Sequence, residues 1–474
     1  MRRPPNPDLV NSNLLSENRA VGDWRLCVDF GTASSKAALG LQADWASAPG
    51  ERMKVLPLGQ FAGNHDPLTV PSALYVDGDR IFFGPRALER AMEVQADSEP
   101  LLSFKMLLGA PDLAALLDML IKRSIDPTGR LTNKHILILY IGYLSALIES
   151  CFENDPALSA VRESVRWRYT RPDWLGSSDE DHDSITKSLF ETGIHIGRQF
   201  KHEFLSEGGL HVVRVLDAIN SGPLASHEHL EGSVLEAHAA AALHAGAAGA
   251  ASPFMLIFDM GAGTTDFAGF KLSDGKSQIQ MLEIGAARRS IVRAGDEVDK
   301  ILMNAFIRKA QLSRSRSDQA ALWRSMSLSI REIKRRIFSV EKATVRFRGK
   351  TIILRRSELE SSPDFEAFTG SVRARFNASL AAVATAARKE KVRAVSVVLA
   401  GGGASLPFIQ AIAKEAERSW KKDARVILEP LAPVWANDPG LPNGFAGAFT
   451  QLEIAIGGAS PLVTVIAPDG ARPA

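Results

Sequence analysis

The sequence predicts an α/β fold made of two lobes that are related by duplication. Two stretches, "LCVDFGTASSKAALG" (26–40) and "MLIFDMGAGTTDFAGF" (255–270), carry this prediction. Each reads as an apolar strand, an Asp, a short turn containing Gly and Thr, and a second apolar strand. Each also heads a long run of further strands and helices. The two hairpins therefore begin two successive β-rich lobes, and they are not members of a short tandem repeat.

Length and composition set the class of protein. The chain has 474 residues, enough for two or three lobes with their own cores, and its 45% apolar and 23% charged content is ordinary for a globular protein. A net charge of +2 makes nucleic acid an unlikely partner of the whole molecule. Two cysteines are too few for a disulfide framework, and no signal peptide is recognisable. We therefore expect a cytoplasmic protein, with residues 1–23 as a disordered leader.

The first lobe is expected over residues 24–247, with a small subdomain at about 66–130. Its first hairpin has strands that end at Phe30 and at about Leu41, and a second hairpin at 69–84 has an Asp-Gly turn signal. Periodicity predicts helices at 85–96, 111–122, 133–152, 181–205 and 232–246, and strands at 165–174 and 211–218. The apolar run "HILILYIGYLSALI" (135–148) is too short to span a bilayer, so we expect a buried helix and no membrane span.

The second lobe is expected over residues 253–429, with a small subdomain at about 294–372. It begins with the hairpin at 254–272. Further strands are predicted near 279–285, at 344–354, at the start of 394–416 and in "DARVILEP", and helices at 295–311, 318–339, 365–389 and the end of 394–416. Residues 430–474 are expected to return to the first lobe through a small-residue helix at 443–452 and to end in a tail.

The two polar turns are suited to binding a phosphate. A tight turn of Gly and Thr directs backbone N–H groups and hydroxyls to one point, and a nearby carboxylate can hold a water of hydrated Mg²⁺. Two such turns that faced each other across a central nucleotide cleft would hold a triphosphate and its metal. The residues concerned are Asp29, Gly31, Thr32 and Ala33 in one turn, and Asp259, Gly261, Gly263, Thr264, Thr265 and Asp266 in the other. The alternative is two ordinary hairpins with polar tips.

A third feature is the glycine triplet in "VVLAGGGASLPFIQAI". Gly401, Gly402 and Gly403 follow a strand, and a helix is expected to begin near Pro407. Without side chains, such a turn lets a ribose or a flat ring lie against the backbone. A glycine triplet after a strand is common, so its position after both hairpins is what gives it weight.

This order of elements resembles the actin-like ATPase superfamily, which has a duplicated ribonuclease H-like fold. Shorter stretches are similar to the seventy-kilodalton heat-shock chaperones (the heat shock protein 70 family). They are "VPSALYV" (70–76), "SFKMLLG" (103–109), "LEAHAAAALHAG" (235–246), "AGDEVDKIL" (294–302) and "REIKRRIFS" (331–339). The resemblance covers about residues 24–452. It implies binding of ATP or ADP with Mg²⁺.

The resemblance also implies roles for individual residues. Lys105, Glu236, Asp259 and Thr264 match the family's catalytic positions, and Asp29, Glu236 and Asp259 would hold Mg²⁺ through water. Residues expected to contact the nucleotide are Asp29, Gly31, Thr32, Ala33, Gly261, Ala262, Gly263, Thr265, Asp266, Gly295, Asp296, Glu332, Arg335, Arg336, Ser339, Gly401, Gly402, Gly403 and Ser405. Ala262 replaces a family glycine, Ser405 replaces an arginine that stacks on adenine, and Leu441 replaces an acidic residue. These departures put turnover in doubt.

The resemblance implies an ATP-driven conformational switch read by an unidentified protein partner. The residues after the last helix are too few for the family's peptide-binding β-sandwich, so we expect none. Residues 462–466 are expected to form an edge strand rather than a remnant of the family's linker. Alternatives are an actin-like filament protein, a small-molecule kinase of the same superfamily, and a scaffold that binds nucleotide without turnover. The segment 311–358 has 13 Lys and Arg against 4 Asp and Glu, and we expect a solvated face rather than a docking site there.

Overall fold

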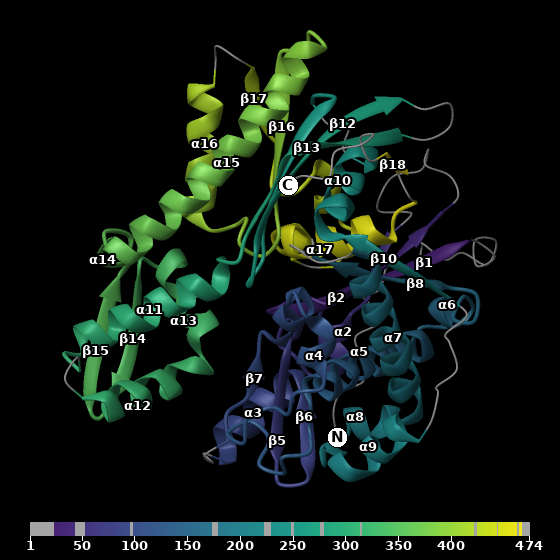
Figure 1. The fold of residues 1–474 in the computed structure, drawn as a ribbon, viewed down its shortest axis with the longest axis vertical. Helices are drawn as coiled ribbons and strands as arrows, with labels where there is room; N and C mark the ends of the chain where they lie inside the picture. Colours follow the sequence, from purple (N-terminus) through teal and green to yellow (C-terminus); the bar gives the residue numbers. More distant parts are fainter. Residues whose placement is uncertain are drawn as a thin grey trace. The chain divides into compact units, whose positions relative to one another are not determined.

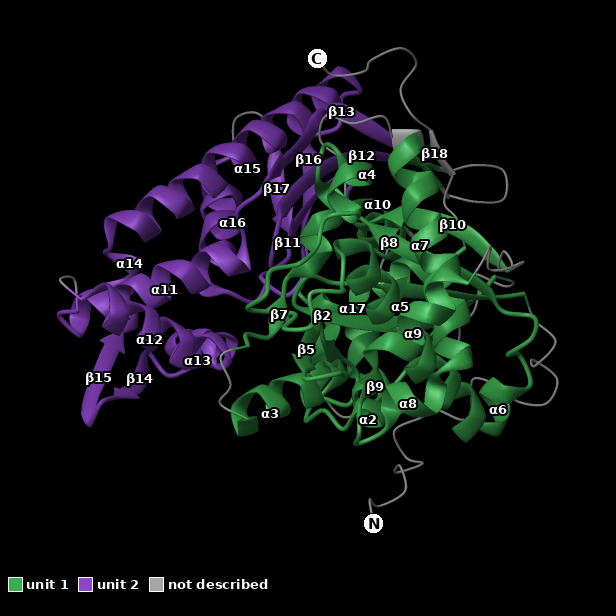
Figure 2. Cartoon of the chain, turned by 60° about the horizontal axis from the view of Figure 1, so that its bottom comes forward, with its two compact units in different colours: residues 1–250, 272–281, 430–466 green, residues 251–271, 282–429, 467–474 purple. Residues whose placement is uncertain are grey.

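The chain forms two compact units, which are discontinuous in sequence. In this computed structural model, unit 1 comprises residues 1–250, 272–281 and 430–466, and unit 2 comprises 251–271, 282–429 and 467–474 (Figure 2). The structure describes residues 23–42, 53–94, 98–172, 179–221, 229–247, 251–274, 279–312, 315–420, 424–442, 444–461 and 464–466. The predicted leader at 1–23 therefore lies outside the described residues, except for Asp23.

The main sheet of unit 1 brings the ends of three parallel strands to one edge. Its order is β10-β8-β1-β2-β3, and β4 also pairs with β2. β8 runs parallel to β1 and to β10, whereas β2 is antiparallel to β1 (Figure 1). The strands are β1 (Trp24–Asp29), β2 (Ser34–Leu41), β3 (Met53–Val55), β4 (Val70–Pro71), β8 (Arg166–Arg171) and β10 (Leu230–Leu235). The carboxyl ends of β1, β8 and β10 therefore share an edge.

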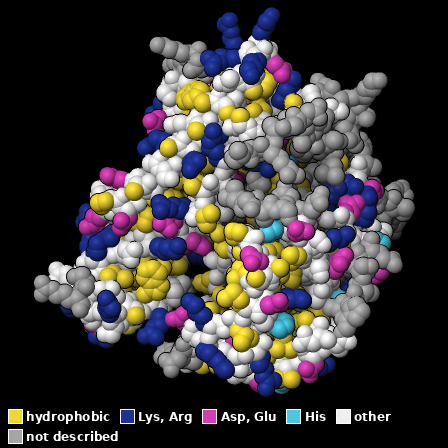
Figure 3. Space-filling view, viewed as in Figure 1, with side chains coloured by type: hydrophobic (Ala, Val, Ile, Leu, Met, Phe, Trp, Pro, Cys, Tyr) yellow, Lys and Arg dark blue, Asp and Glu magenta, His cyan; other side chains and the backbone are white. Residues whose placement is uncertain are grey.

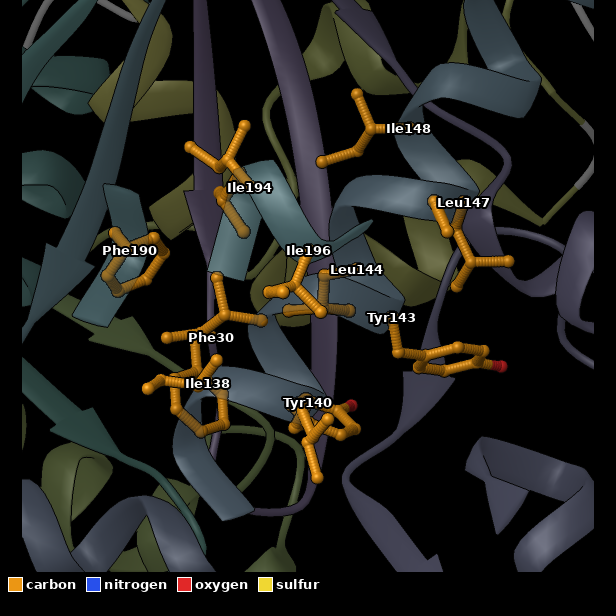
Figure 4. Packing of buried hydrophobic residues seen from close by; sticks show 14 of the residues in the cluster. Phe30, Ile138, Tyr140, Tyr143, Leu144, Leu147, Ile148, Phe190, Ile194 and Ile196 are labelled. Atoms are coloured by element: carbon orange, nitrogen blue, oxygen red, sulfur yellow. The ribbon is translucent and has the colours of Figure 1, made fainter. Parts of the chain in front are cut away.

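Helices cover both faces of this sheet. Alternate residues of β1 point to opposite faces, as the period of a strand requires. Leu26 and Val28 join the core formed with α5 (Asn133–Asn154) and α7 (Asp179–Gln199). Cys27 belongs to the core on the other side, which contains α17 (Phe445–Ala459). Figure 4 shows side chains of α5 and α7 in this core, together with Phe30.

Helix α5 is the one described helix that is long and apolar enough to cross a membrane by length and composition. In this structure 94% of its apolar window is buried. A core helix of a globular protein passes the same test of length and composition, and this burial agrees with the predicted buried helix.

A second, smaller sheet of unit 1 has the order β7-β5-β6-β9. Its strands are β5 (Ala73–Asp77), β6 (Arg80–Phe83), β7 (Leu101–Leu102) and β9 (Leu210–His211). The remaining helices of unit 1 are α2 (Leu58–Ala62), α3 (Gly84–Val94), η3 (Phe104–Gly109), α4 (Leu113–Leu117), α6 (Pro156–Ser159), α8 (Lys201–Leu205), α9 (Val212–Asn220), α10 (Glu236–Ala247) and η4 (Val434–Asn437). The short 3₁₀ helix η3 matters most for the site, because it carries Lys105.

The sheet on which unit 2 is built has the order β17-β16-β11-β12-β13-β18, and its edge strand β18 belongs to the residues of unit 1. The strands are β11 (Phe254–Met260), β12 (Thr265–Asp274), β13 (Ile279–Ile291), β16 (Ala394–Ala400), β17 (Arg425–Leu428) and β18 (Thr464–Ile466). Strand β11 is buried along its whole length. Helix α15 (Pro363–Lys389) packs on it, with the rings of Phe258 and Phe376 5.3 Å apart.

The other elements of unit 2 are a two-stranded hairpin and several helices. They are β14 (Lys342–Phe347), β15 (Lys350–Arg355), α11 (Gly295–Lys309), α12 (Arg316–Ser327), α13 (Ile330–Ser339), α14 (Arg356–Glu360) and α16 (Pro407–Ser419). Phe338 of α13, Phe365 of α15 and Phe408 of α16 form an aromatic cluster with ring centroids 5.3–6.4 Å apart. This cluster fixes α13 next to the first turn of α16.

Several element predictions need correction. The predicted helix at 181–205 is divided at Phe200 into α7 and α8, and only Leu113–Leu117 of the helix predicted at 111–122 is helical. The predicted strand at 211–218 is mostly the helix α9, whose buried Val212, Val215 and Leu216 follow helical spacing despite their β-branched neighbours. The predicted helix at 232–246 begins only at Glu236, because 230–235 form β10. The predicted helix at 318–339 is two helices. Its apolar period continues through the break, so periodicity could not reveal it. The predicted edge strand is confirmed for Thr464–Ile466.

Candidate functional site

The turn of the first hairpin follows β1 at the shared edge of the unit 1 sheet. Asp29 is the last residue of β1, and its register partner on β2 is Lys36. A Cβ added at Gly31 would lie 2.1 Å from the carbonyl oxygen of Ser34, so a larger residue does not fit there. The same added atom would be 3.3 Å from Lys36 Nζ. The ammonium group of Lys36 therefore lies directly beside the turn.

Both oxygens of the Asp29 carboxylate are held by neighbouring side chains. Lys36 Nζ donates to Asp29 Oδ2 over 2.7 Å, and Thr170 Oγ1 donates to Asp29 Oδ1 over 3.0 Å. Thr170 comes from β8, the parallel neighbour of β1. Burial opposes ionisation of Asp29, but Lys36 and then Lys105 outweigh that penalty, so the pKa of Asp29 lies below its ordinary value. Asp29 is therefore a carboxylate at neutral pH.

Lys105 forms a second buried ion pair close to the first. Its Nζ contacts Glu236 Oε1, and both side chains are largely buried. Lys105 lies on η3, and Glu236 is the first residue of α10, directly after β10. Lys105 Nζ also lies 6.0 Å from the ring centre of Phe30, within the range of a cation–π contact. Two carboxylates and two ammonium groups thus gather beside the Gly31 turn.

A group of hydroxyl side chains forms hydrogen bonds with and around the backbone of this turn. Ser72 Oγ donates to the carbonyl oxygen of Gly31 over 2.6 Å, and the backbone N–H of Ser72 donates to the carbonyl oxygen of Ala33. Tyr140 OH lies 3.2 Å from the hydroxyls of Ser35 and Ser72. Ser72 belongs to the "VPSALYV" stretch. The structure gives this stretch a physical role, which is to fix the backbone of the turn.

In unit 2 the second turn contacts the beginning of α11. The backbone N–H groups of Gly295 and Asp296 donate to the carbonyl oxygens of Gly261 and Ala262 over 3.2 and 2.7 Å. Thr264 Oγ1 donates to Asp266 Oδ2 over 2.7 Å. Thr265 Oγ1 donates to the carbonyl oxygen of Arg293, while Asp259 is buried opposite Asp266 in the strand register. Gly263 lies within the same turn.

The glycine triplet lies against the end of β11. Gly401 has a φ of +79°, and a Cβ added there would lie 2.2 Å from Asp259 Oδ1. The backbone N–H of Gly403 donates to the carbonyl oxygen of Met260 over 2.8 Å. Gly402 and Ser405 are exposed. The structure thus brings together three features predicted separately: the second turn, the triplet and the first residues of α11.

The residues expected on the adenosine side lie on the exposed face of α13. Glu332 and Arg335 form an ion pair with each other, and Arg336 and Ser339 are also exposed. Lys334, from the partly buried side of α13, donates to the carbonyl oxygen of Gly295 over 2.9 Å and contacts Asp299 over 3.0 Å. Burial raises the pKa of Asp299, and Lys334 opposes this.

The basic segment 311–358 includes residues that are paired with acids. Arg348 contacts Asp318, and Arg356 contacts Glu341. Figure 3 shows Lys and Arg side chains interspersed with Asp and Glu over the face in view. This mixture of signs is typical of a solvated surface.

The unit 1 residues do not fit a directly bound divalent cation. Among the residues that the structure describes, no three Asp, Glu, His or Cys side chains gather in a metal-binding group. Asp29 and Glu236 are each paired with an ammonium group, which would repel Mg²⁺. The hypothesis that Asp29, Glu236 and Asp259 hold Mg²⁺ through water remains a prediction.

Sequence reasoning missed two residues of this cluster, Lys36 and Thr170. Lys36 carried a signal, because a lysine inside the otherwise apolar strand "SSKAALGL" must find a partner if it is buried. Thr170 carried no signal of its own. Its contact with Asp29 depends on the parallel pairing of β8 with β1, which a sequence pattern does not reveal.

Part of the chain is similar to a known protein family. The family described as Hsp70 protein has a model that matches residues 233–429. The matched segment includes Glu236, the second turn and the glycine triplet, whereas Asp29 and Lys105 precede it. No curated protein matches the chain.

Proposed function

We propose that this Hsp70-like chain, with the actin-like ATPase fold that its family implies, binds ATP, hydrolyses it slowly and signals the nucleotide state to a protein partner. The resemblance read from the sequence is confirmed by the match at residues 233–429, and Hsp70 proteins bind ATP and ADP in general. The observation that carries the proposal is the group of four charged side chains beside the Gly31 turn, of which Asp29, Lys36 and Lys105 are buried and Glu236 is largely buried.

The chemistry of phosphoryl transfer explains why such a group is useful. Cleavage of a γ-phosphate requires charge neutralisation and an aligned water molecule more than it requires covalent catalysis. In the proposed complex, the Lys105 ammonium group leaves its ion pair with Glu236 and binds a phosphoryl oxygen of ATP instead. Glu236, released from this ion pair, then orients the attacking water and accepts its proton.

The second turn is proposed to act on the same phosphates. Thr264 donates its hydroxyl hydrogen to Asp266 in the structure, so its oxygen remains an acceptor for the hydrogen of a water molecule. The backbone of Gly261, Ala262 and Gly263 would supply N–H donors. Hydrolysis and release of phosphate would remove these contacts, and such a loss is a common origin of a nucleotide-dependent conformational change.

The test is a pair of measurements on the wild type and Lys105→Ala. Mg-ATP should raise the midpoint of thermal unfolding of both proteins, because a ligand that binds only the folded state stabilises it by mass action. Phosphate release by Lys105→Ala should fall by about a hundredfold or more, the usual scale for one lost charge-stabilising group.

Lys54→Ala is the matched control, because Lys54 is also a buried lysine of unit 1 and pairs with Asp155 over 2.6 Å. Its turnover per folded molecule should equal that of the wild type. If Lys105→Ala and the wild type release phosphate equally fast, Lys105 is not the catalytic lysine. If ATP does not shift the unfolding of the wild type, the chain is not an ATP-binding protein.

A further inference from the structure

The function proposed above assigns no chemical step to Lys36, yet Lys36 is one of the most buried lysines that the structure describes. Its side chain is 10% exposed and its ammonium group lies beside Gly31 at the turn that is proposed to hold phosphate. We infer that Lys36 replaces a divalent cation in balancing the charge of this turn, so that the chain binds ATP without Mg²⁺. The inference rests on the proposed function.

The charges of the four buried groups carry this inference. Two carboxylates, Asp29 and Glu236, face two ammonium groups, Lys36 and Lys105, so the group is electrically neutral. Without Lys36 it would have one net negative charge beside the Gly31 turn. A polyphosphate would then be repelled unless a cation accompanied it, because charges a few ångströms apart interact strongly near a protein surface.

The geometry agrees with this role. Lys36 Nζ bonds to Asp29 Oδ2 over 2.7 Å, on the carboxylate that could otherwise face a hydrated metal ion. The other oxygen of Asp29 accepts from Thr170. An ammonium group has three N–H donors, and one is used by Asp29. The others can reach a phosphate at the turn, whose Gly31 has no side chain to block the approach.

The experiment compares ATP binding with excess Mg²⁺ and with excess EDTA at constant ionic strength, by titration calorimetry. The wild-type Kd in EDTA should lie within about threefold of its value in Mg²⁺, a difference below 1 kcal/mol. A wild-type Kd that is more than about tenfold weaker in EDTA overturns the inference and leaves the proposed function intact. Failure to bind in either condition overturns both.

Three variants separate the charge of Lys36 from its contribution to folding. Lys36→Met leaves one net negative charge, so its Kd should be about tenfold or more weaker in EDTA than in Mg²⁺. The double variant Asp29→Asn/Lys36→Met restores neutrality and should bind equally well in both conditions. Lys54→Met removes a buried ion pair elsewhere in unit 1 and should leave the ratio unchanged.

Circular dichroism establishes that each variant is folded before the titration. If Lys36→Met does not fold, Lys36→Arg keeps the charge and should retain binding in EDTA. A Lys36→Met protein that folds and shows the same ratio of Kd values as the wild type would show that Lys36 is only a structural partner of Asp29. That result also overturns the inference.

Discussion

Asp29 and Lys36 form a buried ion pair whose partners are strand neighbours. They face each other across β1 and β2, and Thr170 completes the contacts of the carboxylate. Removing one partner of such a pair leaves a buried charge without compensation, whereas replacing both removes the penalty together with the attraction. Single and double substitutions at this pair therefore give different information.

The lowered pKa of Asp29 predicts a dependence of stability on pH. A carboxyl whose pKa is lower in the folded state contributes stability that is fully present above its unfolded pKa of about 3.9. That contribution is lost as the pH falls through the folded pKa. In urea titrations, the free energy of unfolding of the wild type should therefore fall more steeply on acidification below about pH 3.9 than that of Asp29→Asn/Lys36→Met. Parallel curves for the two proteins would contradict this.

Gly401 is the residue of the glycine triplet that the structure constrains most. Its φ of +79° is unfavourable for a residue with a side chain, and a methyl group would overlap Asp259 Oδ1. Gly401→Ala should therefore reduce the free energy of unfolding by about 2 kcal/mol or more. Chemical denaturation measures this change. A loss below about 0.5 kcal/mol would mean that the turn relaxes easily.

At the scale of elements, the central helix of unit 1 begins with a capping box that contains a histidine. His135 Nδ1 accepts from the backbone N–H of Thr132 over 3.1 Å, and Thr132 Oγ1 accepts from the N–H of His135. Burial first, and Lys134 second, lower the pKa of His135 below 6.5. Protonation would place a hydrogen on Nδ1 and remove its capacity to accept.

This cap should make the stability of α5 sensitive to pH. The contribution of neutral His135 is fully present above about pH 6.5 and is lost as the pH falls through the lower, folded pKa. His135→Gln keeps an acceptor that does not titrate, as capping boxes often have. From about pH 8 to pH 5 the free energy of unfolding should fall further for the wild type than for His135→Gln. The expected difference between the two losses is at most about 1 kcal/mol. Equal losses in denaturant titrations would exclude this role.

Helix α15 contains an exposed glycine, Gly370, in its interior. An added Cβ there meets nothing within 4 Å. Gly370→Ala should therefore raise the free energy of unfolding by about 1 kcal/mol, because alanine loses less backbone entropy on forming a helix. It is also the matched control for Gly401→Ala in unit 2, with the opposite expected sign. A decrease in stability would mean that α15 needs the flexibility of glycine.

For the whole molecule, each of the two units has its own polar hairpin turn. The turn in unit 1 is surrounded by the ion pairs of Asp29 and Lys105, and the turn in unit 2 by α11 and the glycine triplet. The proposed function requires that one nucleotide contacts both turns.

Hydrogen–deuterium exchange can test this requirement on the intact chain. Addition of ATP should slow backbone exchange in peptides that cover both turns, residues 29–36 and 259–266, because bound phosphate accepts from their N–H groups. Peptides from α15 serve as the internal control, and their rate of exchange should not change. Protection of one turn alone would contradict a nucleotide shared by the two units.

The sequence alone determined the hairpins, the glycine triplet and the likeness to an Hsp70 family. Period-two alternation, turn chemistry and short motifs are local properties, and they remain visible without a structure. The same local reasoning failed where periodicity was ambiguous, as in the helix α9. It also missed the strand β10, which places Glu236 at the edge of the sheet.

The charge arrangement of the site was decided only by the tertiary structure. Lys105 and Glu236 are 131 residues apart in sequence and form a buried pair, and Thr170 reaches Asp29 across two parallel strands. Strand order and register bring such residues together, and neither property can be read from a single sequence. The partner of a buried charge is selected by the fold, because burial makes a missing partner costly.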